Sequence, residues 1–169
     1  MSDAPLPKRK SIRLRGYDYA APNWYFVTIC VDRRRAIFGT VVETQVALSR
    51  AGRIVANTWN RLPEFYPVAL ENFVIMPNHL HGIVVIEDVS PSSEIPPPRR
   101  PALSEIIRGF KSMSAREINR AARKPRAVWQ RGFYEHVIRD DSDLARIREY
   151  IDDNPIAWAN DPENPDRIP

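Results

Sequence analysis

Two apolar, β-branched stretches joined by a very short turn limit most strongly how this chain can fold. VALENFVIM (68–76) and HGIVVI (81–86) both have the composition of β-strands. The turn between them contains Pro77 and Asn78. We therefore expect the two strands to pair as a hairpin, which makes an antiparallel sheet the centre of the fold.

The rest of the chain alternates between patterns typical of strands and of helices. We expect strands at 24–31 and 127–139 (the latter alternatively an extended loop), and helices at 46–62, 102–122 and 141–154. In the last helix we expect Asp141 or Ser142 to cap the start and Pro155 to enforce the end. The resulting order of elements predicts an α+β, ferredoxin-like fold, an antiparallel sheet with helices on one face and an added C-terminal helix.

Composition and size predict one globular domain with flanking segments. The 169 residues are enough for a single core. We expect a basic N-terminal arm at 1–20, the domain at 21–160 with a Pro/Ser-rich linker at 87–101, and a tail at 161–169.

Neither a membrane-spanning run nor a secretory signal is recognisable in the sequence, so we expect no membrane association. The single cysteine, Cys30, cannot form an internal disulfide, which favours a cytoplasmic protein.

Basic residues are clustered along the chain although the net charge is only +4. The segment 8–15 has five basic residues and no acidic one, and the segment 99–131 has ten basic residues against two acidic ones. Clustered cations are compatible with solvated helix faces, but two such clusters favour a polyanion, and nucleic acid in particular.

His79 and His81 begin the second strand of the expected hairpin. Residues i and i+2 of a strand point to the same face, so the two imidazoles project together while Leu80 points into the core. Such a pair can bind a metal ion, or it can be two hydrogen-bonded histidines at a turn. The spacing alone leaves both interpretations open.

Tyr150 and Asn154 lie four residues apart and are therefore neighbours on one face of the last predicted helix. That face flanks the apolar stripe of Leu144, Ile147 and Ile151. A tyrosine at the edge of the core and an asparagine at a helix end explain the pattern structurally. The same pair can also offer a hydroxyl nucleophile and an oxygen that completes a His-His-Asn metal site.

The His-hydrophobic-His strand followed by WQRGFYEHVIRDDSDLARIREYIDDNP resembles the single-tyrosine transposases of the HUH class. The resemblance is strongest to their REP-associated branch within the IS200-like transposase superfamily, and it covers roughly residues 15–160. It implies that His79, His81 and Asn154 hold Mg²⁺ or Mn²⁺ and that Tyr150 on the C-terminal helix is the nucleophile. The expected activity is cleavage and rejoining of DNA through a 5′-phosphotyrosine.

The expected partner is single-stranded or hairpin DNA, possibly a repetitive extragenic palindrome, bound by a monomer or a homodimer. Phosphate contacts are predicted for six basic residues: Arg33, Arg34, Arg35, Lys111, Arg116 and Arg120. Trp129, Phe133 and Tyr134 can stack on bases or fill the core. His136 can assist a proton transfer, bind a phosphate or be structural.

Two other functions remain open from the sequence. One is a non-catalytic module that binds single-stranded nucleic acid, in which Tyr150 is structural. The other is a metallohydrolase with zinc on His79, His81 and either His136 or Cys30.

Overall fold

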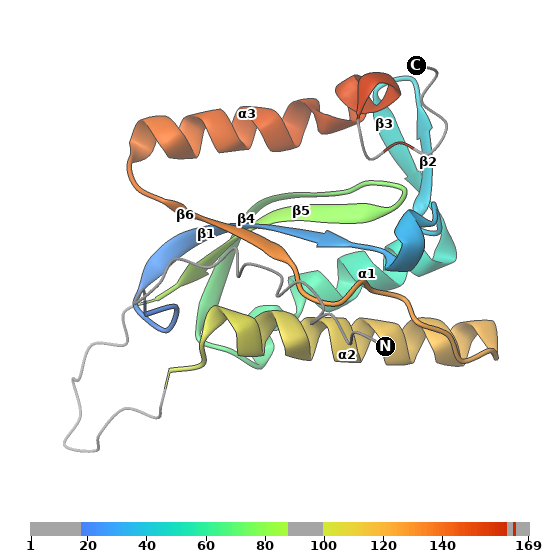
Figure 1. The fold of residues 1–169 in the computed structure, drawn as a ribbon, viewed down its shortest axis with the longest axis horizontal. Coiled ribbons are helices and arrows are strands. Elements are labelled where there is room, and N and C mark those ends of the chain that lie inside the picture. The colour runs from blue at the N-terminus through green and yellow to red at the C-terminus, as the bar shows by residue number, and fades with distance from the viewer. Residues whose placement is uncertain (1–17, 88–99, 162–163, 165–169) are drawn as a thin grey trace, which may run out of the picture.

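The computed structural model describes residues 18–87, 100–161 and 164, and its centre is a four-stranded antiparallel sheet (Figure 1). The strands lie in the order β4-β5-β1-β6, with β1 at Asn23–Cys30, β4 at Val68–Ile75, β5 at His79–Ile86 and β6 at Tyr134–Ile138. Helices α1 (Arg50–Asn60) and α2 (Leu103–Ala122) cover one face, and α3 (Asp141–Ala157) lies across the other. The predicted architecture, including the added C-terminal helix, is confirmed.

The expected hairpin is formed by β4 and β5. Ile75 lies opposite Leu80 and Val74 lies opposite His81. The Met76 amide donates to the His79 carbonyl at 2.9 Å, which closes the turn. Strand β5 starts at His79, two residues before the predicted 81, so both histidines belong to regular strand.

The main hydrophobic core lies between the sheet and the α1–α2 layer. Trp59 of α1 and Phe110 of α2 are fully buried there, with their rings edge to face. Trp59 also explains Gly82 in the middle of β5, because a Cβ at position 82 would come within 2.6 Å of the indole. A smaller apolar cluster of Ile83, Ile138, Ile147 and Ile151 lies on the other face, beneath α3.

A second hairpin replaces the first part of the helix predicted at 46–62, and that prediction is wrong for 46–49. Strands β2 (Gly39–Val42) and β3 (Gln45–Leu48) pair through a two-residue turn, in which Glu43 has a φ of 55°. Helix α1 starts at Arg50 because the Ser49 hydroxyl caps it, accepting from the Gly52 amide at 3.1 Å.

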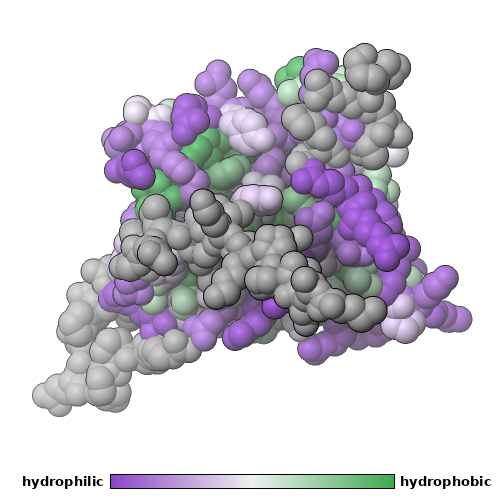
Figure 2. Space-filling model, in the orientation of Figure 1, coloured by the Kyte–Doolittle hydropathy of each residue, from purple (hydrophilic) through white to green (hydrophobic). Residues whose placement is uncertain are grey.

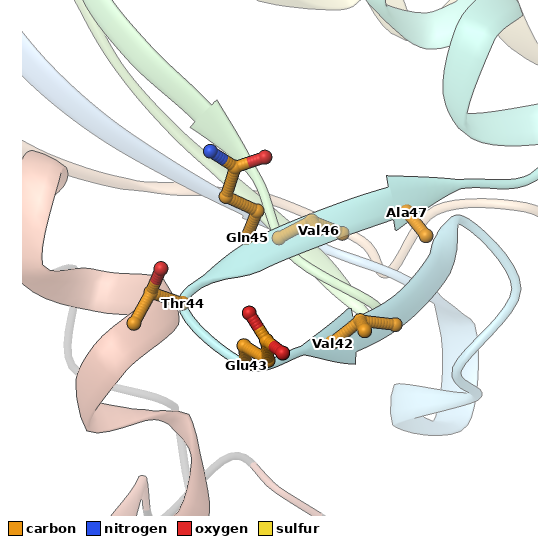
Figure 3. A pocket seen from close by; sticks show the side chains of 6 residues that line it. All are labelled: Val42, Glu43, Thr44, Gln45, Val46 and Ala47. Atoms are coloured by element: carbon orange, nitrogen blue, oxygen red, sulfur yellow. The ribbon is translucent and has the colours of Figure 1, made fainter.

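The β2–β3 hairpin also forms a surface hollow of about 330 Å³, lined by its own residues 42–47 (Figure 3). None of the predicted site residues lines this hollow. The chain then passes through α1 and a short 3-10 turn, Leu62–Glu64, before it enters β4.

The last helix starts at Asp141, as predicted, but its predicted cap and its predicted end are wrong. The cap is Asp140, not Asp141 or Ser142, since its carboxylate accepts from the Asp143 amide at 2.9 Å. The helix continues through Pro155 to Ala157 and is followed by a 3-10 turn, Trp158–Asn160. A proline so close to a helix end removes only one hydrogen bond, and here Pro155 is buried.

The helix predicted at 102–122 matches α2, and the strand predicted at 24–31 matches β1. In the segment 127–139 the strand is limited to Tyr134–Ile138, preceded by an isolated bridge between Val31 and Trp129.

The predicted arm, linker and tail lie mostly outside the described residues. Within the part of the chain that the structure describes, the helices are too short or too polar to cross a membrane.

Candidate active site

His79 and His81 project from β5 toward α3, while Leu80 points into the main core. Both imidazoles are buried, and their ring centroids are 4.4 Å apart. The prediction that the two histidines share one face and lie side by side is confirmed. Histidines this deeply buried need partners for their ring nitrogens.

Each imidazole is held at Nδ1 by a neighbouring side chain. Nδ1 of His79 lies 2.8 Å from Oδ1 of Asn78, and Nδ1 of His81 lies 2.8 Å from Oγ1 of Thr28, its partner across β1. The Asn78 amide donates to the Arg34 carbonyl, which orients its oxygen toward His79. His79 therefore carries its proton on Nδ1, and its Nε2 has a free lone pair.

The surroundings favour the neutral form of both rings. Burial lowers the pKa of His79 to about 4, although the negative charge of Asp161 and the neighbouring Asn154 side chain oppose this shift. Burial, together with the charge of His79, holds the pKa of His81 well below its usual value. Neutral imidazoles are the form that binds metal ions, so the pair is ready to act as ligands at neutral pH.

Helix α3 brings Tyr150 and Asn154 to the same histidines. The Tyr150 hydroxyl lies 3.4 Å from Nε2 of His81, and the two ring centroids are 5.2 Å apart. Phe26 of β1 stacks on His81 and meets Tyr150 edge-on. Tyr150 thus faces the histidine pair of its own chain.

The ionisation of the Tyr150 hydroxyl depends on three influences. Partial burial raises its pKa, an interaction with the Asn154 side chain lowers it, and the charge of Asp161 raises it. The net direction is upward, so the hydroxyl is protonated at neutral pH.

Two buried atoms at this site form no hydrogen bond with any described residue: Nε2 of His79 and Oδ1 of Asn154. An unpaired buried acceptor is costly unless a ligand pairs with it. Together with Nε2 of His81, these atoms form a donor set of two imidazole nitrogens and one amide oxygen. This set fits a divalent ion of the Mn²⁺ or Mg²⁺ type.

The residues needed for the alternative zinc site are not assembled. His136 is paired with Asp143 instead, with Nε2 and Oδ2 2.7 Å apart. Cys30 lies opposite His79 in the β1–β5 pair, but burial raises the pKa of its thiol. In the described residues, no three His, Cys, Asp or Glu side chains are grouped to hold a metal ion.

The six basic residues predicted to contact DNA occupy three places. Arg33 and Arg34 lie in the short turn after β1 with positive φ, and the charge of Arg34 acts on His79. The Arg35 guanidinium donates to the Asp32 and Ala127 carbonyls. The Lys111 ammonium donates to the Gln130 and Gly132 carbonyls, so both side chains also stabilise loops.

Arg116 and Arg120 lie on α2, on the opposite face of the sheet from the histidines. They line a hollow of about 280 Å³ against α1, together with Arg61. Of the three aromatic candidates, Trp129 is buried with its indole NH on Ser114, and Phe133 packs against the main core. Tyr134 is exposed on β6.

Sequence reasoning missed four residues that shape the site: Thr28, Asn78, Trp158 and Asp161. Asn78 could have been inferred, because it directly precedes His79 and buried ligating histidines need such a partner. The position of Thr28 opposite His81 depends on the β1–β5 register. The Trp158 ring lies 6.1 Å from that of His79, because the chain folds back after α3. The positions of Thr28, Trp158 and Asp161 at the site depend on the fold and could not be inferred from the sequence.

Comparisons with known proteins show the family of this chain. The family model described as "Transposase IS200 like" matches residues 23–154. An uncharacterized protein of Haemophilus influenzae is 38% identical over 94% of each chain. A second protein of that organism, named as a REP-associated tyrosine transposase, is 28% identical over 82% of this chain and 73% of its own.

A solved structure, titled as a REP-associated tyrosine transposase bound to a REP hairpin, has the same fold. Its TM-score is 0.59 at 18% identity, over 93% of this chain and 81% of that one. Since the family model spans the whole sheet and reaches Asn154, the chain belongs to the IS200-like transposase family.

Proposed function

We propose that this transposase cleaves and rejoins single-stranded or hairpin DNA through a covalent 5′-phosphotyrosine on Tyr150. The observation that carries the proposal is the Tyr150 hydroxyl 3.4 Å from Nε2 of His81, beside two buried acceptors that have no partner among the described residues. A nucleophile next to a set of nitrogen and oxygen donor atoms is the arrangement that metal-assisted phosphoryl transfer requires.

His79, His81 and Asn154 would hold the divalent ion, Mg²⁺ or Mn²⁺. When bound, the ion supplies Lewis-acid polarisation of the scissile phosphate. Asn78 and Thr28 keep the two imidazoles oriented at Nδ1, and burial keeps the rings neutral. These supporting contacts need no movement at the moment of reaction.

Tyr150 attacks phosphorus through its phenolic oxygen. The bond between phosphorus and the 3′ oxygen breaks, the phenol loses its proton, and the leaving 3′ oxygen gains one. The raised pKa of Tyr150 keeps its hydroxyl protonated before the attack. The Asn154 side chain lowers this pKa, so it helps to stabilise the phenolate that forms as the proton leaves. Attack of a 3′-hydroxyl on the phosphotyrosine reverses these steps and rejoins a strand without nucleotide hydrolysis.

Two further observations support DNA as the substrate. The chain shares its fold with a protein whose structure is titled as bound to a REP hairpin. Arg34 lies next to the site, where it can contact a phosphate close to the cleaved bond. Since Tyr150 faces the histidines of its own chain, a single copy contains every proposed catalytic group.

The test is covalent adduct formation on a labelled hairpin DNA that carries a single-stranded extension, with Mn²⁺ present. Tyr150→Phe removes one oxygen and keeps the ring, so DNA affinity should persist while the adduct disappears. Tyr134→Phe is the matched control, since Tyr134 is equally exposed but lies on β6.

The adduct is read on a denaturing gel, and mass spectrometry of the DNA-linked peptide locates it. An adduct on Tyr134, or one unchanged by Tyr150→Phe, would refute the nucleophile. Binding without any metal-dependent cleavage would favour the alternative function, a non-catalytic nucleic-acid module.

A further inference from the structure

The two flanks of α3 differ in how far they are closed against the sheet. On the β4 flank, Arg148 donates to Glu71 at 2.8 Å and the Asn72 amide donates to Asp152 at 3.1 Å. On the β6 flank, Tyr150 is 50% exposed and Tyr134 is 51% exposed. A DNA strand that reaches Tyr150 therefore has its open approach over β6.

Figure 2 shows the molecule from the side on which β6 crosses in front of β1. Hydrophobic atoms are visible between α3 and the sheet, and hydrophilic side chains border them. The open flank thus combines apolar surface with polar groups, as single-stranded nucleic acid requires for its bases and phosphates.

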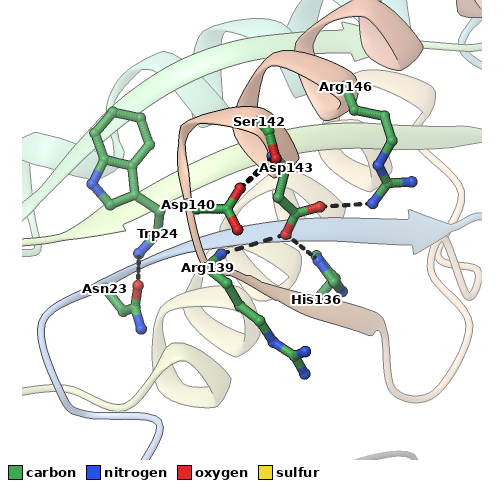
Figure 4. Close-up of polar contacts among 8 residues, drawn as sticks. All are labelled: Asn23, Trp24, His136, Arg139, Asp140, Ser142, Asp143 and Arg146. Carbon is green, nitrogen blue, oxygen red and sulfur yellow. Dashed lines mark hydrogen bonds and ion pairs between the residues drawn. The ribbon is translucent and has the colours of Figure 1, made fainter.

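A cluster of three ionisable side chains, His136, Asp143 and Arg146, lies on this flank (Figure 4). Asp143, in the first turn of α3, accepts from His136 of β6 at 2.7 Å and from Arg146 at 2.7 Å. Its side chain is only 15% exposed, whereas those of His136 and Arg146 are 43% and 71% exposed. The groups that the cluster presents to solvent are therefore the imidazole and the guanidinium.

The Asp143 carboxylate acts as an anchor for these two groups. Its hydrogen bonds, first with His136 and then with Arg146, lower its pKa to about 2, so it is ionised at neutral pH. One carboxylate that bonds to both basic side chains fixes the direction of both. Pre-oriented basic side chains lose less entropy on binding an anion.

The cluster lies close to the proposed nucleophile, Tyr150. Arg146 precedes Tyr150 by four residues, so the two lie on the same face of α3, about 6 Å apart along its axis. His136 lies opposite Phe26 in the β1–β6 pair, and Phe26 contacts both His81 and Tyr150. A strand cleaved at Tyr150 would place a neighbouring phosphate beside this cluster.

We infer that His136 and Arg146, positioned by Asp143, bind a phosphodiester of the cleaved strand within two nucleotides of the scissile phosphate. The inference rests on the proposed function for the identity of the cleaved strand. It assigns His136 and Arg146 to substrate positioning, outside the metal site and outside the nucleophile.

The experiment measures binding of a fluorescent hairpin DNA with a single-stranded extension, in a Tyr150→Phe background so that cleavage is not needed. One phosphate at a time is replaced by an uncharged methylphosphonate. On unmodified DNA, Arg146→Ala and His136→Gln should each weaken binding about fivefold, the size of one exposed charge contact. For Arg146→Ala, the slope of log affinity against log salt should fall by about 0.7.

The decisive result is the dependence on one phosphate. When the methylphosphonate replaces the phosphate that the cluster contacts, the Arg146→Ala variant should bind as well as the chain with Arg146. Arg146→Lys should retain part of the affinity on unmodified DNA. Arg108→Ala is the charge-matched control, because Arg108 is exposed on α2 on the other side of the sheet, and any loss there should not depend on this phosphate.

The inference is overturned if the Arg146→Ala loss persists at every methylphosphonate position, or if the sensitive phosphate lies more than two nucleotides from the cleaved one. It is also overturned if Arg146→Ala and His136→Gln bind unmodified DNA normally, since Asp143 would then serve only to stabilise the start of α3. Failure of the proposed function would instead appear on the adduct gel as no product on Tyr150.

Discussion

The two faces of the central sheet differ in how they are covered. The face under α1 and α2 is a continuous apolar core built around buried side chains such as Trp59 and Phe110. The face under α3 has a small apolar cluster, and the rest of it is occupied by polar side chains around His79 and His81. Apolar burial is thus concentrated on one face, and the proposed active site, with buried acceptors that have no partner among the described residues, lies on the other.

The largest effect should come from removing one histidine of the α3 face. His79→Ala should reduce adduct formation at least about 100-fold, because a metal site with two remaining ligands binds its ion poorly. DNA affinity should change little, since it depends on the basic side chains. The measurement compares adduct yield across a Mn²⁺ titration and in EDTA, and thermal unfolding confirms that the variant is folded. Normal cleavage by His79→Ala in EDTA would exclude a metal role for this face.

Truncating a large side chain of the main core should instead reduce the stability of the fold. Trp59→Ala should lower the free energy of unfolding by about 3–5 kcal/mol, the usual cost of truncating a fully buried aromatic side chain. Ile151→Ala, under α3, should cost about 2 kcal/mol, because the cluster around it is small. Urea denaturation of both variants measures the difference. Equal losses would show that the two faces contribute alike to stability.

Lowering the pH should destabilise the fold through the buried histidines of the α3 face. His79 has a pKa of about 4 in the fold and about 6.5 when unfolded, so below pH 6.5 the unfolded chain binds more protons. The free energy of unfolding should therefore have its full value above pH 6.5 and decrease as the pH falls toward 4. The decrease that comes from His79 alone should be up to about 3 kcal/mol. His79→Gln should flatten this part of the profile, as measured by urea denaturation between pH 7 and pH 4. An unchanged profile would mean that His79 is already charged in the fold.

Local periodicity in the sequence predicted which of the site residues lie together on one face of a strand or helix. Alternation along a strand places His79 and His81 together, and helical spacing places Tyr150 one turn from Asn154. The same periodicity failed at 46–49, where apolar residues fit both a strand and a helix and the Ser49 cap decides between them. Local spacing is therefore reliable for which residues share a face and weak for where an element starts.

Apart from the contact of Asn78 with His79, the supporting contacts could not be predicted, because they depend on strand register and on how the chain returns over the sheet. Thr28 reaches His81 only through the pairing of β1 with β5. His136 meets Asp143 only because α3 folds back over β6 after a two-residue connection. These supporting residues are far from the ligands in sequence or lie on another element, so no short motif contains them.

The smallest expected effect concerns the closed flank of α3, and it tests whether the polar contacts there position Tyr150 or stabilise the fold. The Asn72 amide donates to the Asp152 carboxylate near the surface, and such exposed contacts contribute at most about 1 kcal/mol. Asn72→Ala should therefore lower the free energy of unfolding by about 0.5 kcal/mol or less. Its cleavage rate should nevertheless fall about threefold, since a small displacement of a nucleophile is costly. Asp152→Ala should behave in the same way, and the double variant should be no slower than either single one if the two side chains act through one contact. Additive rate losses, or none, would mean that this flank leaves Tyr150 where the apolar cluster beneath α3 has already placed it.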